Sequence, residues 1–175
     1  MCNNTKGRIA DAVEELICTQ PGGKVTVQQV MELTQMNRQS FYYHYQDIND
    51  VLRRIVTQRF CLPLAFDPDE DVEDWCRRGL TLVKDQKTLL RRISRELGSD
   101  RMYELASPVL RPQVERMIPR KPDQSQAQRN RAVEAISFGI LCSITGLLLR
   151  RESLDVEKTM EKLRAVLEAL SISLE

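Results

Sequence analysis

Apolar side chains recur every three or four positions along most of this chain, which is the spacing of one helix face. The first such stripe is formed by Ile9, Val13, Leu16 and Ile17. No stretch of the sequence alternates apolar and polar side chains in the way that a half-buried strand does. The pattern therefore predicts an all-α protein.

Two short helices are predicted within residues 26–45. Thr26, with a glutamine three positions later, forms a capping-box pattern in front of an apolar stretch. The periodicity breaks at Thr34 and Gln35 and resumes after Asn37, which is a favourable N-cap residue. Two short helices joined by a tight turn are typical of a helix-turn-helix, whose second helix enters the major groove of DNA.

A further N-cap pattern at Asp47 predicts a third helix after the turn, and Pro63 and Pro68 then predict a linker. This divides the chain into a helix-turn-helix domain, residues 1–62, and a larger helical domain for ligand binding and dimerisation, residues 63–175. The second domain is expected to consist of longer helices.

Two strong helices are predicted at the end of the chain, near 129–151 and 154–172. An earlier helix is expected to be interrupted at Pro108 and Pro112. The last helix carries a heptad-like seam, and the one before it carries a stripe of small residues that lets another helix approach closely. The seam is Val156, Met160, Leu163, Leu167, Leu170 and Leu174, and the stripe is Gly139, Ser143 and Gly146.

Composition narrows the function classes. The chain has 26 basic and 25 acidic residues, so any contact with DNA must come from a local surface and not from overall charge. The sequence has one histidine, no metal-ligand cluster, no glycine-rich phosphate loop and no nucleophile elbow. We therefore expect no enzyme activity, no catalytic residue, no metal and no cofactor.

The cysteines and the termini bear on the compartment. Five cysteines without a C-x-x-C pattern form neither a disulfide framework nor a zinc site, which favours free thiols in a reducing cytoplasm; redox sensing by one of them is the alternative. The N-terminus shows no apolar signal region. The uncharged apolar run 135–149 is shorter than the ~20 residues that a bilayer requires, so no membrane contact is expected.

The second helix of the predicted helix-turn-helix begins with side chains that suit base edges. Arg38 can bond guanine and Gln39 adenine in bidentate fashion, and Ser40 can serve either base. Tyr42, Tyr43 and His44 come one turn later, and their polar tips suit phosphates, which position a protein without reading sequence. The alternative is that the aromatic residues simply form a core.

Thr26 begins a helix and is expected to present its hydroxyl and nearby N–H groups to another phosphate. Phe41 is expected to face inward and fix the angle between the two helices. The predicted DNA-binding residues are Thr26, Asn37, Arg38, Gln39, Ser40, Tyr42, Tyr43 and His44.

This segment resembles the DNA-binding signature of the TetR family of one-component regulators, over about residues 8–55. Gln35 stands where the family usually has Gly, and Ile48 stands where it tends to have a phosphate-binding Lys. The run 37–42 also resembles a subgroup that includes regulators of dihydroxyacetone kinase operons. The matching positions are Thr26, Val27, Val30, Met36, Asn37, Phe41, Tyr42, Tyr43 and Tyr45.

The resemblance implies a homodimer, joined by the two C-terminal helices, that binds a palindromic double-stranded operator and is a repressor responsive to a small molecule. The alternative is a DNA-binding regulator whose C-terminal domain recognises a partner protein instead. A pocket is expected between the middle helices, although each residue proposed for it is more often part of a core. Those residues are Trp75, Leu80, Leu90, Ile93, Met102, Tyr103 and Phe138.

Overall fold

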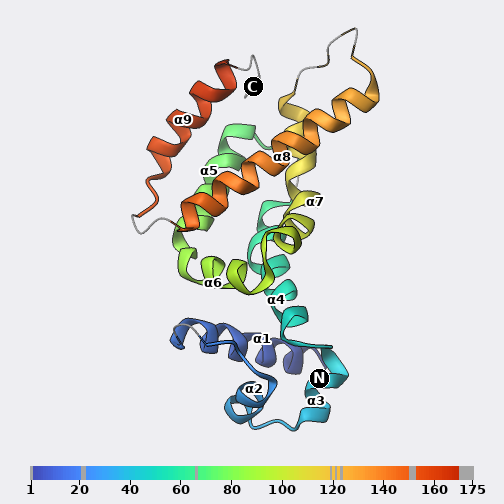
Figure 1. Cartoon of the computed structure of the whole chain (residues 1–175), viewed down its shortest axis with the longest axis vertical. Coiled ribbons are helices and arrows are strands. Elements are labelled where there is room, and N and C mark those ends of the chain that lie inside the picture. The colour runs from blue at the N-terminus through green and yellow to red at the C-terminus, as the bar shows by residue number, and fades with distance from the viewer. Residues whose placement is uncertain are drawn as a thin grey trace.

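The computed structural model describes residues 2–20, 23–65, 67–118, 120, 122, 124–149 and 153–169, and its regular secondary structure is helical; for 2–4 and 166–169 only the backbone is described. No strand occurs in this part of the chain, so the predicted all-α class is confirmed. The helices of the N-terminal part gather at one end of the molecule, and α4 leads from them into the remainder (Figure 1).

The N-terminal end consists of α1 (Cys2–Thr19), α2 (Val27–Thr34), α3 (Arg38–His44) and α4 (Ile48–Val56). Helix α1 packs against both α2 and α4, and α2 packs against α3. The three predicted N-caps are confirmed, because the side chains of Thr26, Asn37 and Asp47 each accept a hydrogen bond from a backbone N–H in the first turn of the helix that follows. Helices α2, α3 and α4 therefore each begin at the residue directly after the predicted N-cap.

The segment after α4 stays helical for two more turns instead of becoming a linker at once. A π-helical turn, η1 (Thr57–Cys61), and a 3-10 turn, η2 (Leu62–Leu64), continue it. The indole N–H of Trp75 donates to the carbonyl of Leu64 at 3.0 Å, which ties η2 to the next helix. One buried apolar core runs from α1 to the C-terminal part, so no gap in packing marks the boundary predicted at residue 62.

The middle of the chain forms α5 (Val72–Asp85), α6 (Lys87–Leu97) and α7 (Ser99–Met117). Gly98, between α6 and α7, has φ 80°, a backbone conformation that glycine adopts more readily than a residue with a Cβ. The predicted interruption at Pro108 and Pro112 was wrong, because α7 runs through both prolines. Packing of α7 along its neighbours holds it together although each proline lacks an N–H for the helix ladder.

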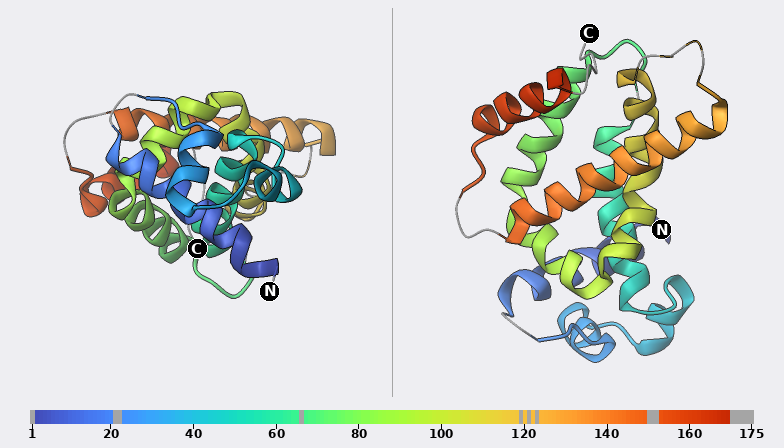
Figure 2. Two further views of the ribbon diagram at one scale, coloured as in Figure 1. Left: turned by 90° about the horizontal axis from the view of Figure 1, so that it is seen from below. Right: turned by 45° about the horizontal axis from the view of Figure 1, so that its top comes forward.

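The chain closes with α8 (Gln126–Leu149) and α9 (Val156–Ala169). Helix α8 lies along α7 and crosses in front of it in the right-hand view of Figure 2, and α9 lies beside α5. Glu73 of α5 is paired with Arg77 at 3.0 Å and with Arg164 of α9, and Arg77 also pairs with Glu157. The Arg164 hydrogen bond is the main cause that lowers the pKa of Glu73.

The described half of the predicted seam on α9 packs inside the subunit. Met160 is fully buried, and Leu163 contacts a small apolar cluster formed by Val72 and Met117. Leu167 lies where only the backbone is described, and Leu170 and Leu174 lie outside the described residues. The expectation that the seam serves a dimer therefore needs correction for its first half, which is used by α5 and α7.

Helix α8 leaves one apolar face open. Phe138 is 51% exposed, and no side chain of the described residues comes within 4 Å of the Cβ position at Gly139 or Gly146. The helix is long and apolar enough to cross a bilayer by length and composition, and 22% of its most apolar window is buried. The uncharged run 135–149 is by itself too short to span a bilayer, but the helix that contains it is longer, since it begins at Gln126.

Candidate DNA-binding site

The first helix of the pair, α2, begins with a complete capping box. The backbone N–H and the hydroxyl of Thr26 both donate to Oε1 of Gln29 at 2.9 Å, and the N–H of Gln29 lies 3.3 Å from the Thr26 hydroxyl oxygen. Because the hydroxyl proton of Thr26 is used within the box, the groups left to meet a phosphate are the N–H groups of Val27 and Gln28. These are the first two residues of the helix and have no intrahelical acceptor.

The turn between α2 and α3 depends on Gln35. Its φ of 55° and ψ of 32° place it in the left-handed region, which Gly adopts most readily. The N–H of Gln35 donates to the carbonyl of Met31, and the Arg8 guanidinium donates to the carbonyl of Thr34 at 3.0 Å. Arg8 thus satisfies a carbonyl at the end of α2, and this contact was not predicted from the sequence.

Two aromatic residues of the motif hold α3 in place. Phe41 is fully buried, as predicted, and its ring centroid lies 6.0 Å from that of the buried Tyr45. The Tyr45 hydroxyl donates to the carbonyl of Lys6 in α1 at 3.1 Å, and burial raises the pKa of this phenol. The alternative that the aromatic residues form a core therefore holds for Phe41 and Tyr45.

The remaining side chains of α3 face outward. Arg38 and Gln39 are exposed and make no hydrogen bond with any side chain that the structure describes, while Ser40 is half-buried. Tyr42 is 57% exposed and Tyr43 is 77% exposed. The Tyr42 ring lies edge-on to the buried Phe41, with ring centroids 5.5 Å apart, but more than half of its surface stays exposed, so burial does not explain Tyr42 or Tyr43.

His44, at the end of α3, is half-buried and lies edge-on to Tyr43, with ring centroids 4.8 Å apart. The structure thus brings the predicted residues Arg38 to His44 onto one short helix at the end of the molecule, with Thr26 and Asn37 at the starts of α2 and α3 (Figure 1).

The charge around this surface suits an anion. Segment 23–46 carries Lys24 and Arg38 and a single acid, Glu32, which accepts a hydrogen bond from Gln28 at 3.0 Å. Neither α2 nor α3 has an acid in its first turn to compete with a phosphate. Lys24 is exposed just before α2 and was missed as a candidate contact, although a basic residue in front of a helix start was the available signal.

Two arginines connect α1 to the rest of the molecule. The Arg92 guanidinium of α6 donates to the carbonyl of Ile17 and lies 3.5 Å from that of Gln20, at the C-terminus of α1. Arg59 of η1 forms a bidentate pair with Glu14, with N–O distances of 3.0 and 3.1 Å. A cation at a helix C-terminus stabilises the end of that helix, so Arg92 links α6 directly to α1.

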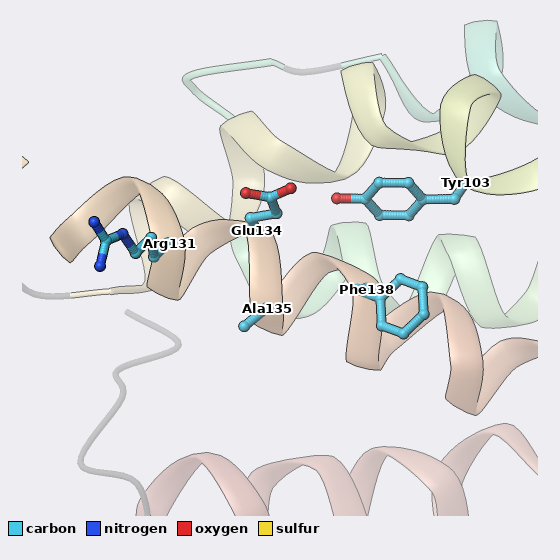
Figure 3. Close-up of a pocket in the computed structure, with 5 residues that line it drawn as sticks. All are labelled: Tyr103, Arg131, Glu134, Ala135 and Phe138. Atoms are coloured by element: carbon cyan, nitrogen blue, oxygen red, sulfur yellow. The ribbon is translucent and has the colours of Figure 1, made fainter. Parts of the chain in front are cut away.

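The residues proposed for a pocket do not form one. Trp75, Leu90, Ile93 and Met102 are buried in the core, and Leu80 packs partly buried against it. Phe138 and Tyr103 instead line an open groove of about 300 Å³ on the outside of α7 and α8. Figure 3 shows the Tyr103 hydroxyl pointing toward Glu134 in that groove, with Arg131 and Ala135 along the same helix.

Neither metal nor thiol chemistry stands out in the described residues. No group of three His, Cys, Asp or Glu side chains is placed to hold a metal ion there. Burial raises the pKa of Cys76 to about 12 and also raises that of Cys61, so both stay as thiols at neutral pH. Cys18 and Cys142 are exposed.

Comparison with known proteins places the fold. No family model and no curated protein matches the sequence. A TetR transcriptional regulator from Streptococcus agalactiae 2603V superimposes with a TM-score of 0.68 and 17% identity over 95% of this chain and 94% of its own. The dihydroxyacetone kinase operon activator DhaS superimposes with a TM-score of 0.61 and 16% identity over 95% of each chain. This chain therefore has the fold of TetR regulators.

Proposed function

We propose that this protein is a cytoplasmic, TetR-type transcription regulator that binds a palindromic operator as a homodimer. The observation that carries the proposal is the outward face of α3. Arg38, Gln39, Tyr42 and Tyr43 stand exposed on a helix that the buried Phe41 fixes to the domain. A helix held in this way and bearing these donors is what major-groove recognition requires.

In this proposal the residues divide by what they contact. Arg38, Gln39 and Ser40 read base edges from the first turn of α3, and Asn37 sets the start of that turn. Tyr42, Tyr43 and His44 contact phosphates, together with the N–H groups at the start of α2 that Thr26 caps. Lys24 adds a phosphate contact that compensates in part for Ile48, where the family tends to have a lysine.

We propose that the second copy covers the open face of α8. Its exposed stripe is apolar and carries no charged residue from Phe138 to Leu149. Exposure of such a surface to water is unfavourable, so its burial against a second copy would stabilise a dimer. Gly139 and Gly146 have open space beside them, which allows a second helix to approach closely. The same two-fold contact would place two α3 helices on successive half-sites of a palindrome.

The dimer proposal is tested by charging the stripe. Cys142→Asp is expected to turn a dimer into a monomer in sedimentation velocity, since an unpaired buried carboxylate at a helix contact is costly. The matched control is Ala127→Asp, an exposed position at the start of the same helix. A Cys142→Asp protein that remains dimeric would place the interface elsewhere.

The DNA-binding proposal is tested without knowing the operator. Duplexes are first selected from a random pool with the wild-type protein, and we expect the selected sites to be palindromic. Arg38→Ala should then weaken binding to a selected duplex about 10- to 100-fold, the loss of one bidentate base contact. The control Arg101→Ala changes an exposed arginine of α7 and should leave affinity unchanged. Equal affinity for both variants would refute the assignment of α3.

We propose repression as the outcome of binding and a small molecule as its signal, as the resemblance in sequence implies. One protein of the same fold is an operon activator, so whether this protein represses or activates transcription has to be tested separately. A reporter gene placed downstream of the selected duplex answers it, because deletion of a repressor raises expression and deletion of an activator lowers it.

A further inference from the structure

Helix α1 is bonded to the helix-turn-helix pair at three places, and it lies between that pair and α6 (Figure 1). At the start of α2, the side-chain N–H of Gln29 donates to the side-chain carbonyl of Gln20 at 2.9 Å. At the end of α2 the contact is the one made by Arg8, and at the end of α3 it is the one made by Tyr45. Because α2 is held at both ends and α3 at its far end, α1 fixes the direction of both helices.

Gln20, directly after α1, contacts both halves of the protein. Its backbone N–H donates to the carbonyl of Leu16 at 3.0 Å, so its position is set by the last turn of α1. Its backbone carbonyl lies 3.5 Å from the guanidinium of Arg92 in α6, which also holds the carbonyl of Ile17. Its side chain accepts from Gln29 of α2. Gln20 therefore joins the helix pair to α6 through one residue.

The Gln29 side chain is engaged at both of its polar atoms. Its Oε1 accepts from the backbone N–H and the hydroxyl of Thr26, and its Nε2 donates to Gln20. A side-chain amide that is held at both atoms has one orientation, so a displacement of Gln20 is passed to the first turn of α2. The neighbouring Gln28 instead bonds within α2, to Glu32 at 3.0 Å.

We propose that Gln20 is a positioning residue for DNA binding. It holds the start of α2 against the end of α1 that Arg92 fixes to α6, and it thereby holds α3 at one angle to the rest of the subunit. This inference deepens the DNA binding proposed above and rests on it. In a dimer, that angle sets the separation of the two α3 helices, which has to match the spacing of the two half-sites.

Loss of the Gln20 side chain would loosen the helix pair without unfolding it. Val30 of α2 and Phe41 of α3 are fully buried, and their packing does not depend on Gln20. The loss is one hydrogen bond between α1 and the start of α2, after which the pair samples a range of angles. A loosely held pair has to be ordered when it binds, which lowers affinity at the best spacing and lets other spacings bind nearly as well.

The first test measures tolerance for half-site spacing, on the selected duplex and on the same duplex with one base pair inserted at or removed from its centre. The wild-type protein should lose at least about tenfold in affinity when the spacing changes. Gln20→Leu should bind the selected duplex about three- to tenfold more weakly, and should lose only about threefold or less when the spacing changes.

A variant that was merely less stable would bind all of these duplexes more weakly by the same factor, so the spacing ratio separates positioning from stability. The matched control is Thr19→Val, at an exposed neighbour whose hydroxyl bonds within α1 to the carbonyl of Glu15. It should keep the wild-type affinity and the wild-type spacing ratio. If Gln20→Leu does not fold, Gln20→Ala removes the same acceptor and takes its place.

The second test is hydrogen exchange in the free protein and needs no DNA. The amides of Gln29 and Val30, which bond to Thr26, should exchange faster in Gln20→Leu. Gln20→Glu, which keeps an acceptor of the same reach, should restore slow exchange. Arg92→Met should also speed exchange there, but should add nothing in a Gln20→Leu background, because its effect passes through Gln20.

The outcomes separate this proposal from the proposed function. An unchanged spacing ratio in Gln20→Leu, unchanged exchange at the start of α2, or additive effects of Arg92→Met and Gln20→Leu would each overturn the positioning role and leave DNA binding in place. A wild-type protein that selects no duplex would refute the proposed function, and with it any role of Gln20 in DNA binding, whatever exchange shows about its hold on α2.

Discussion

Replacing Gln35 by Gly should stabilise this protein, although the substitution removes a side chain. Gln35 has φ 55° in the turn between α2 and α3. A residue with a Cβ pays about 1–2 kcal/mol there, while Gly pays about 0.5–1 kcal/mol more backbone entropy on folding. The difference is a gain of about 0.5–1 kcal/mol, which for a chain of this length raises the melting temperature by roughly 1–4 °C.

The assay is thermal and urea denaturation at one fixed protein concentration, because a dimer's melting temperature depends on concentration. The matched control is Gln58→Gly, an exposed glutamine inside η1, where Gly should instead cost about 1 kcal/mol. Gln35→Asn should behave like Gln35→Gly, since Asn tolerates the left-handed region. The reasoning fails if Gln35→Gly destabilises the protein as much as Gln58→Gly does.

Three further outcomes are expected. Tyr45→Phe should cost about 1 kcal/mol in urea unfolding, because it leaves the Lys6 carbonyl without its 3.1 Å hydrogen bond. Arg92→Met should speed hydrogen exchange in the last turn of α1, and unchanged exchange would mean that the cap has no effect. The pKa of Glu73 lies below its ordinary value of 4.5 when α9 is docked, so its pairing with Arg164 stabilises the folded state above that pH and is lost as the pH falls through the lowered pKa. Amide exchange in α9 should therefore rise at acid pH in the wild-type protein, and this rise should shrink in Glu73→Gln.

The features that the sequence predicted well are the local ones. Thr26, Asn37 and Asp47 cap helices within their own few residues, so side-chain chemistry alone was enough to place those starts. The break in periodicity at Thr34 and Gln35 likewise placed the turn between the two helices, and the structure adds that Gln35 takes the left-handed conformation there.

The features that the sequence missed depend on distant partners. A proline inside a helix can be tolerated when neighbouring helices hold the segment, which no local pattern around Pro108 reveals. Arg8 and Arg92 donate to backbone carbonyls of Thr34 and Ile17, and every residue has such a carbonyl. The candidate DNA-binding surface was therefore predictable from the motif, whereas the contacts that hold it to the rest of the molecule were not.

The packing of α9 decides which surface is left for a second copy of the chain. Met160 and Leu163 of α9 pack inside the subunit. Most of the apolar surface that a second copy would contact therefore has to come from the open face of α8. Because α8 would carry the two-fold contact, a small change in its tilt against α7 would be passed to both subunits at once. The spacing of the two α3 helices, and with it operator affinity, would then change without any contact between ligand and DNA.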